Sequence, residues 1–219
     1  LRLTESLRAI SGRDDVPILI DQEGGRVARM RPPHWPAFPP GERFAQLFEL
    51  APSSAIEAAR SNARAIALVL RASGINVNCL PMLDVRQPGA SDIIGDRALG
   101  SQPMQVAALG RAMLDGMASA GVVGVIKHIP GHGRALVDSH EALPVVTATA
   151  DDLEVDLEPF ERLARAPMAM VAHVLYSAWD PDRPASQSPI VIDQIIRKRI
   201  GFDGFLMSDD IGMEALDGD

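Results

Sequence analysis

Short apolar runs rich in β-branched residues alternate along this chain with longer segments that have helical periodicity. The expected strands cover residues 17–21, 75–83, 122–127, 168–173 and 204–208. The expected helices cover residues 1–10, 52–73, 103–120, 150–165 and 189–200. This alternation is typical of βα units built around a parallel sheet. The sequence therefore predicts an α/β fold.

Local signals support these boundaries. Gly74, Gly121 and Gly201 each stand between an expected helix and the next strand, where a glycine commonly ends a helix. Thr149 precedes two aspartates, as at a helix start with acidic residues in its first turn.

The longest connections follow the expected strands and are rich in glycine, proline and polar residues. They cover residues 24–41, 86–102, 129–146 and 174–188. In a parallel α/β protein such loops lie at the carboxyl edge of the sheet, where active sites are built. Five strands are too few to close an eight-stranded barrel. Two folds therefore stay open here: an open doubly wound sheet, or a (β/α)8 barrel of the TIM type with strands outside this chain.

Composition excludes several function classes. A net charge of −8 and a pI near 5.1 argue against a nucleic-acid binder, which needs a concentrated basic surface. No apolar run approaches the roughly 20 residues that span a bilayer. Cys79 is the single cysteine, so no intrachain disulfide can form, and a reducing compartment is compatible. We expect Cys79 to be a buried strand residue without a catalytic part.

The densest polar segment follows the third expected strand. It reads KHIPGHG from Lys127, with His128 and His132, and continues to Asp138, Ser139 and His140. A solvated loop with satisfied histidines is the alternative reading. Asp138 and His140 are two residues apart and share one side of an extended loop. A carboxylate beside an imidazole stabilises the protonated ring, which suits general acid and base catalysis.

The last expected strand ends in Ser208, Asp209 and Asp210. A carboxylate at the carboxyl end of a strand can point into a pocket and act as a nucleophile. A helix cap is the alternative reading. With two adjacent aspartates both can hold, with Asp209 for chemistry and Asp210 for the backbone.

Two further loops carry charged residues. The first expected strand ends at Asp21, and Arg29 follows it, while Arg97 lies on the next long loop. Carboxylates and arginines at strand ends suit the recognition of sugar hydroxyls, although surface salt bridges would give the same pattern.

Together these segments resemble the family 3 glycoside hydrolases, and within them the bacterial cytoplasmic β-N-acetylglucosaminidases of peptidoglycan recycling. The matching stretches read IDQEGGRVAR, NVNCLPMLDV, IGDRALG, KHIPGHGRALVDSH, MVAHVLY and GFDGFLMSDDIGM. They cover nearly the whole chain, and KHIPGHG followed by DSH is the most specific of them.

The resemblance implies a (β/α)8 barrel, a retaining double displacement, and neither a metal nor an organic cofactor. It implies that Asp209 is the nucleophile and His140 the acid/base, with Asp138 as its partner. It further implies that N-acetylglucosamine is held by Asp21, Arg29, Arg97, Lys127 and His128. The substrates implied are muropeptides in which N-acetylglucosamine is β-1,4-linked to 1,6-anhydro-N-acetylmuramic acid, in the cytoplasm.

The family barrel has a strand before the one that ends at Asp21 and further strands after Asp209. This chain starts at Leu1 and stops at Asp219, so we expect residues 1–219 to be one catalytic barrel domain without its first and last strands. The absent strands bring the activity of this chain alone into question.

Two rival functions remain open. A metal-dependent hydrolase could use His128, His132, His140 and Asp209 as zinc ligands, with a bound water as nucleophile. Lys127 and Arg97 would then place positive charge beside a cation. A sugar-binding fragment that keeps the pocket without turnover is the non-enzymatic alternative.

Overall fold

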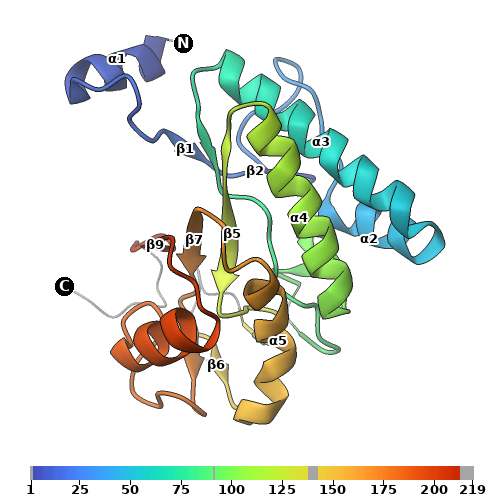
Figure 1. The fold of residues 1–219 in the computed structure, drawn as a ribbon, viewed down its shortest axis with the longest axis vertical. Coiled ribbons are helices and arrows are strands. Elements are labelled where there is room, and N and C mark those ends of the chain that lie inside the picture. The colour runs from blue at the N-terminus through green and yellow to red at the C-terminus, as the bar shows by residue number, and fades with distance from the viewer. Residues whose placement is uncertain (1, 91, 138–142, 213–219) are drawn as a thin grey trace.

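The computed structural model describes residues 2–90, 92–137 and 143–212 (Figure 1). Its central feature is a parallel sheet in the order β1-β4-β5-β7-β9. The strands are β1 (Leu19–Ile20), β4 (Val77–Asn78), β5 (Val123–Ile129), β7 (Met168–Val171) and β9 (Phe205–Ser208). The sheet follows the chain without the reversal of strand order that a doubly wound fold requires. The doubly wound alternative is therefore wrong, and the curled sheet is part of a (β/α) barrel.

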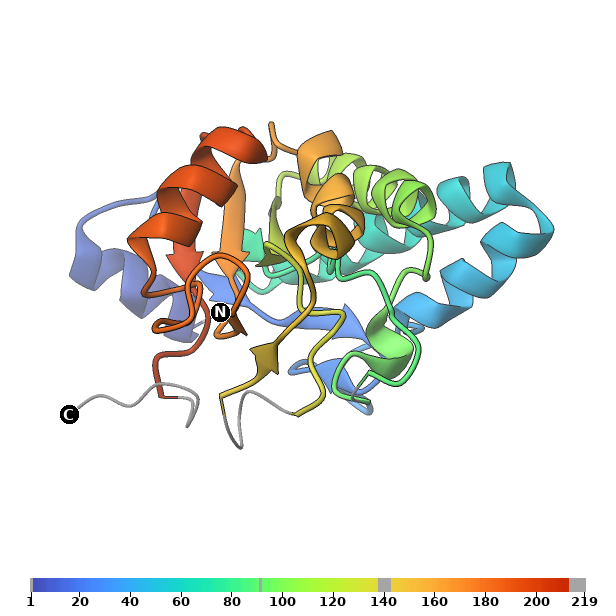
Figure 2. The ribbon, with the colours of Figure 1, turned by 90° about the horizontal axis from the view of Figure 1, so that it is seen from below.

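The connecting helices follow one another along one face of this sheet (Figures 1 and 2). They are α3 (Pro52–Ala72), α4 (Pro103–Ser119), α5 (Ala150–Arg162) and a π-helix, η2 (Val191–Arg199). The helix α2 (Gly41–Leu50) precedes α3. The first helix, α1 (Arg2–Ser11), does not pack on the sheet with the others. It contacts the chain just after α3, where Arg8 donates to the carbonyl of Gly74 at 2.8 Å.

Small residues allow α3 and α4 to pack closely. Ala55, Ala59, Ala63 and Ala67 recur every four residues on α3 and are fully buried, so they form one face of the helix. Gly116 of α4 lies against the backbone of α3, where an added Cβ would overlap the carbonyl of Arg60. This contact fixes the two helices against each other.

Short strands shape the carboxyl edge of the sheet. The strands β2 (Gln22–Gly24) and β3 (Val27–Ala28) form an antiparallel hairpin, and β6 (Val145–Val146) pairs in parallel with β8 (Leu175–Tyr176). A 3₁₀ turn, η1 (Gly95–Arg97), lies in the loop after β4. None of these elements was expected from the sequence, because each is too short to show a hydrophobic period.

Three expectations about individual elements need correction. The strand expected over residues 75–83 pairs regularly only at Val77 and Asn78, and Pro81 beyond them has no N–H to donate. The helix α2 was not expected; it lies between the loop expected over residues 24–41 and the helix expected from residue 52. The last helix has π rather than α geometry. No helix in the described part of the chain is long and apolar enough to cross a membrane.

Replacement of Gly116 by alanine tests the close approach of α3 and α4. Although alanine favours helices, its methyl group would meet the carbonyl of Arg60, so we expect Gly116→Ala to lower the free energy of unfolding by about 1–3 kcal/mol. Urea denaturation measures this change. The control is Ala118→Ser, exposed on the same helix, which should stay within about 0.5 kcal/mol of wild type. An unchanged or stabilised Gly116→Ala would contradict the packing argument.

Candidate active site

Side chains from the carboxyl ends of the strands meet in one pocket. The cavity has a volume of about 260 Å³. It is lined by Asp21, Glu23, Arg26, Val27, Arg29, Ile93, Ile94, Arg97, Lys127, His128, His132, Asp209 and Asp210. Carboxylates and cations dominate this lining in equal number, so the pocket suits a neutral ligand with many hydroxyl groups better than an apolar one.

The segment after β1 is held by two buried amides. The side chain of Asn78, at the end of β4, accepts from the N–H of Gln22 and donates to its carbonyl, both at 3.0 Å. The Gln22 side chain in turn accepts from the N–H groups of Arg29 and Met30, each at 3.0 Å. These bonds fix the hairpin β2–β3 and hold Asp21 and Glu23 at the edge of the pocket.

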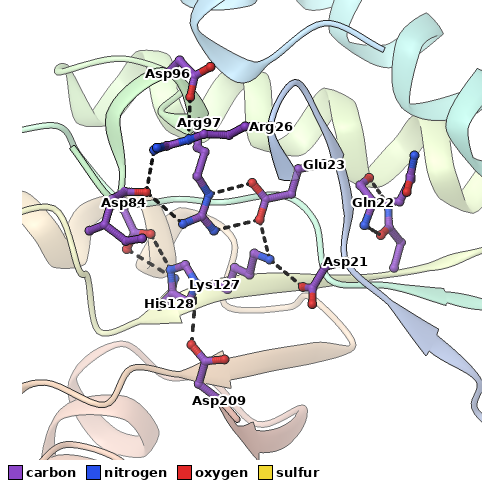
Figure 3. Close-up of polar contacts among 12 residues, drawn as sticks. Asp21, Gln22, Glu23, Arg26, Asp84, Asp96, Arg97, Lys127, His128 and Asp209 are labelled. Carbon is purple, nitrogen blue, oxygen red and sulfur yellow. Dashed lines mark hydrogen bonds and ion pairs between the residues drawn. The ribbon is translucent and has the colours of Figure 1, made fainter. Parts of the chain in front are cut away.

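Glu23 joins two cations beneath the pocket (Figure 3). Arg97 binds it through two parallel bonds, with Nε 2.9 Å from Oε2 and Nη2 2.8 Å from Oε1. The Nζ of Lys127 lies 2.6 Å from Oε1 of Glu23 and 3.0 Å from Oδ1 of Asp21. Only 5% of the Glu23 side chain and 2% of the Lys127 side chain are exposed. These ion pairs are therefore shielded from solvent.

The charges in this network stabilise one another. Burial disfavours the Glu23 carboxylate, but Lys127 and Arg97 outweigh burial and lower its pKa to about 2. Burial also disfavours the Lys127 ammonium, yet Glu23 and Asp21 keep its pKa above the ordinary value. Burial opposes the charge on Asp21, and Lys127 nevertheless holds its pKa below the usual range. All of these groups are ionised at neutral pH.

A register shift lets two consecutive residues of β5 line the pocket. The pairing of β5 with β7 is irregular between Lys127 and Ile129. Such an irregularity changes the direction of side chains along a strand. Lys127 and His128 are both buried and both line the cavity.

Asp84 fixes the ring of His128. Its Oδ2 lies 2.7 Å from Nδ1 of His128, and its Oδ1 accepts the backbone N–H of His132 at 2.6 Å. Asp84 is completely buried, and although burial opposes its charge, His128 lowers its pKa. Because an ionised carboxylate only accepts, Nδ1 of His128 carries a proton and Nε2 points into the pocket.

Asp209 faces Nε2 of His128 across the pocket (Figure 3). Its Oδ2 lies 3.8 Å from that nitrogen, and 17% of its side chain is exposed. The neighbouring Asp210 accepts the N–H of Gly212 at 2.9 Å. Asp209 also accepts a backbone bond, from the N–H of Asp210 to its Oδ1 at 2.9 Å, so it is the Oδ2 of Asp209 that is open to a ligand.

His132 is the second buried histidine of the pocket. Its burial, followed by the effect of His128, lowers its pKa to about 4. Its Nδ1 has no hydrogen-bond partner among the described residues. His132 is therefore a neutral ring at neutral pH.

The base of the loop after β5 is anchored to α5 and to β8. Arg134 Nε lies 2.5 Å from Oδ2 of the buried Asp156, and the Tyr176 hydroxyl donates to the carbonyl of Gly131 at 2.6 Å. Burial raises the pKa of Asp156 to about 6. Asp138 and His140, expected to be the acid/base pair, lie outside the described residues, as does Ser139.

Metal ligation finds no support in the described part of the chain. No group of three or more histidine, cysteine, aspartate or glutamate side chains there could hold a metal ion. His140, the fourth member of the zinc set considered above, lies outside that part.

The six described residues expected at the site all line this one pocket: Asp21, Arg29, Arg97, Lys127, His128 and Asp209. Their individual roles remain predictions. Cys79 is buried, as expected, and its burial raises the pKa of the thiol to about 11. Glu23 and Asp84 were assigned no individual role from the sequence, although each follows an expected strand as a carboxylate at the carboxyl edge.

The pH dependence of stability tests the role of Glu23. Its pKa is lowered from 4.5 to about 2 in the folded chain, so its contribution is present above pH 4.5 and lost as the pH falls towards 2. We expect Glu23→Gln to cost about 3–5 kcal/mol of unfolding free energy at neutral pH, because two buried cations lose their anion.

The difference between wild type and Glu23→Gln should shrink steadily in acid, as measured by urea denaturation at a series of pH values. The matched control is Glu49→Gln, an exposed position on α2, whose stability curve should run parallel to that of wild type. A constant difference between Glu23→Gln and wild type would mean that Glu23 has the same pKa in the folded and unfolded chain, so that its ion pairs do not stabilise its charge.

Comparison with known proteins identifies the family. A curated relative named Beta-hexosaminidase, from Thioalkalivibrio sulfidiphilus, is 40% identical over 220 residues, which cover 99% of this chain and 62% of the relative. Another of the same name, from Bordetella avium, is 37% identical and matches 97% of this chain and 61% of its own length. This chain therefore spans less than two thirds of the length of these relatives.

Solved structures agree with this fold. The crystal structure of NagZ from Neisseria gonorrhoeae in complex with N-trifluoroacetyl-D-glucosamine has a TM-score of 0.89 and 36% identity, over 96% of this chain and 62% of that one. The family model of the glycosyl hydrolase family 3 N-terminal domain matches residues 3–218. The chain belongs to the family 3 glycosyl hydrolases, as a five-stranded part of their N-terminal (β/α)8 barrel domain.

Proposed function

We propose that this domain is the catalytic part of a retaining exo-β-N-acetylglucosaminidase. The observation that carries the proposal is the solvent-accessible Asp209 carboxylate, which faces a pocket of neutralised charges at the carboxyl edge of the barrel. Relatives named Beta-hexosaminidase and a relative that binds an N-acylated glucosamine support the same chemistry.

The pocket offers what a monosaccharide needs. Asp21, Lys127 and Arg97 present acceptors and donors at fixed positions, and such groups bind vicinal hydroxyls through pairs of hydrogen bonds. Lys127 and Arg97 already have Glu23 as their counter-ion. A neutral sugar can therefore enter the pocket without leaving a buried cation unpaired. We propose that Arg29 and His128 complete the set of sugar ligands.

The proposed reaction has two displacements. The Asp209 carboxylate attacks the anomeric carbon while His140 gives its proton to the departing glycosidic oxygen, so that a glycosyl ester forms on Asp209. A water molecule then gives a proton to His140, and its oxygen displaces Asp209 from the same carbon. Two inversions leave the β configuration unchanged. Asp138 stabilises the protonated form of His140.

The substrate class proposed is muropeptides that carry terminal N-acetylglucosamine β-1,4-linked to 1,6-anhydro-N-acetylmuramic acid, in the cytoplasm. Neither metal nor organic cofactor takes part in this reaction. Nucleic acids and membranes are not among the proposed partners, since the chain is acidic.

Hydrolysis of 4-nitrophenyl N-acetyl-β-D-glucosaminide tests the proposal. We expect wild type to release 4-nitrophenol with EDTA present, and Asp209→Ala to lose at least about 10³-fold in kcat while it still binds N-acetylglucosamine. Asp203→Ala, an exposed aspartate just before β9, is the matched control and should retain wild-type turnover.

Three other results would count against this function. Loss of turnover with EDTA would favour the metal-dependent hydrolase. Turnover by Asp209→Ala would place the nucleophile elsewhere. Binding of N-acetylglucosamine by a folded wild type that releases no 4-nitrophenol would make this chain a sugar-binding fragment.

A further inference from the structure

A buried histidine outside the pocket connects the segment that carries Asp209 to the neighbouring strand. His173 stands two residues after the end of β7, and only 1% of its surface is exposed. Its Nε2 lies 3.0 Å from the backbone carbonyl oxygen of Asp210, and its Nδ1 lies 2.6 Å from the hydroxyl of Ser186. It does not line the pocket.

These two contacts determine the form of the ring. A carbonyl oxygen only accepts, so Nε2 of His173 must carry the proton that it donates to Asp210. In the neutral ring, Nδ1 then accepts, and Ser186 is the donor. Ser186 is itself held in place, because the preceding Ala185 donates its N–H to the carbonyl of Val174 at 2.8 Å.

The bond from His173 completes the support around Asp209. The sheet ends at Asp209, whose N–H donates to the carbonyl of Val171 at 3.1 Å. One residue further along the chain, the carbonyl of Asp210 accepts a hydrogen bond from His173, which lies in the loop after β7. The peptide group before Asp209 and the peptide group after Asp210 are thereby both fixed, on either side of the reacting carboxylate.

We propose that His173 is a positioning residue for the reaction, with its tautomer set by the carbonyl of Asp210 and supported by the hydroxyl of Ser186. This inference rests on the proposed function, with Asp209 as the nucleophile. His173 does not touch the sugar, so its loss should reduce the rate of attack and leave sugar binding unchanged. A displacement of about 1 Å at a reacting group can cost on the order of 10²-fold in rate.

A pair of amide substitutions separates the two contacts. The amide nitrogen of glutamine reaches the position of Nε2, whereas that of asparagine reaches only the position of Nδ1. His173→Gln can therefore still donate to Asp210, and His173→Asn cannot. We expect His173→Asn to lose about 10²-fold in kcat for 4-nitrophenyl N-acetyl-β-D-glucosaminide with KM nearly unchanged, and His173→Gln to restore most of that rate.

A second pair leaves His173 intact. Ser186→Ala removes the donor to Nδ1 but leaves the bond from Nε2 to Asp210, so we expect a smaller loss of kcat than in His173→Asn. The matched control is Ser177→Ala, in the same β7–β9 connection as Ser186. It removes a hydroxyl that donates to the carbonyl of Val146, and it should keep the wild-type kcat. Thermal unfolding of all four variants identifies any that are not folded.

Nitrogen NMR of the full chain measures the tautomer without any need for activity. Protonated Nε2 and unprotonated Nδ1 on His173 would support the inference, and the opposite tautomer would overturn it. Equal kcat losses in folded His173→Asn and His173→Gln, or wild-type kcat in His173→Asn, would also overturn it. A wild type without turnover would refute the proposed function instead, and the NMR result would still decide the state of His173.

Discussion

The buried ion pairs of Glu23 hold the pocket together. Lys127 comes from the centre of the sheet and Arg97 from the loop after β4, and burial makes both charges unfavourable unless an anion lies beside them. Glu23 supplies that anion from the hairpin after β1. Three segments far apart in the sequence are thus fixed relative to one another, and the cations remain available for polar contacts with a ligand.

The same principle recurs around the pocket, where groups buried behind it orient the residues that face it. Asp84 lies behind His128 and directs its free nitrogen towards Asp209. Asn78 and Gln22 hold the segment with Asp21. Such support matters because a site with loose side chains loses most of its catalytic advantage, even when every residue is present.

The sequence was sufficient to predict the parallel sheet, its five strands and six of the residues in the pocket. The strands rest on hydrophobic periods, whereas the six pocket residues rest on charged residues that follow strands together with the resemblance to the family 3 glycoside hydrolases. The sequence did not predict the register shift that turns both Lys127 and His128 inwards, because irregular pairing depends on the neighbouring strand. Nor did it identify Asp84 as the partner of His128, since that contact joins residues 44 positions apart.

We propose that Asp209 forms a covalent bond with the sugar in the pocket that Glu23 organises. An N-acetylglucosaminyl fluoride with a second fluorine on the ring slows the second displacement, so the glycosyl-enzyme can be digested and mapped by mass spectrometry. We expect the added mass on the peptide that contains Asp209, with the sugar bound to its carboxylate. An adduct on any other residue, or turnover with an inverted product and no adduct, would contradict that claim.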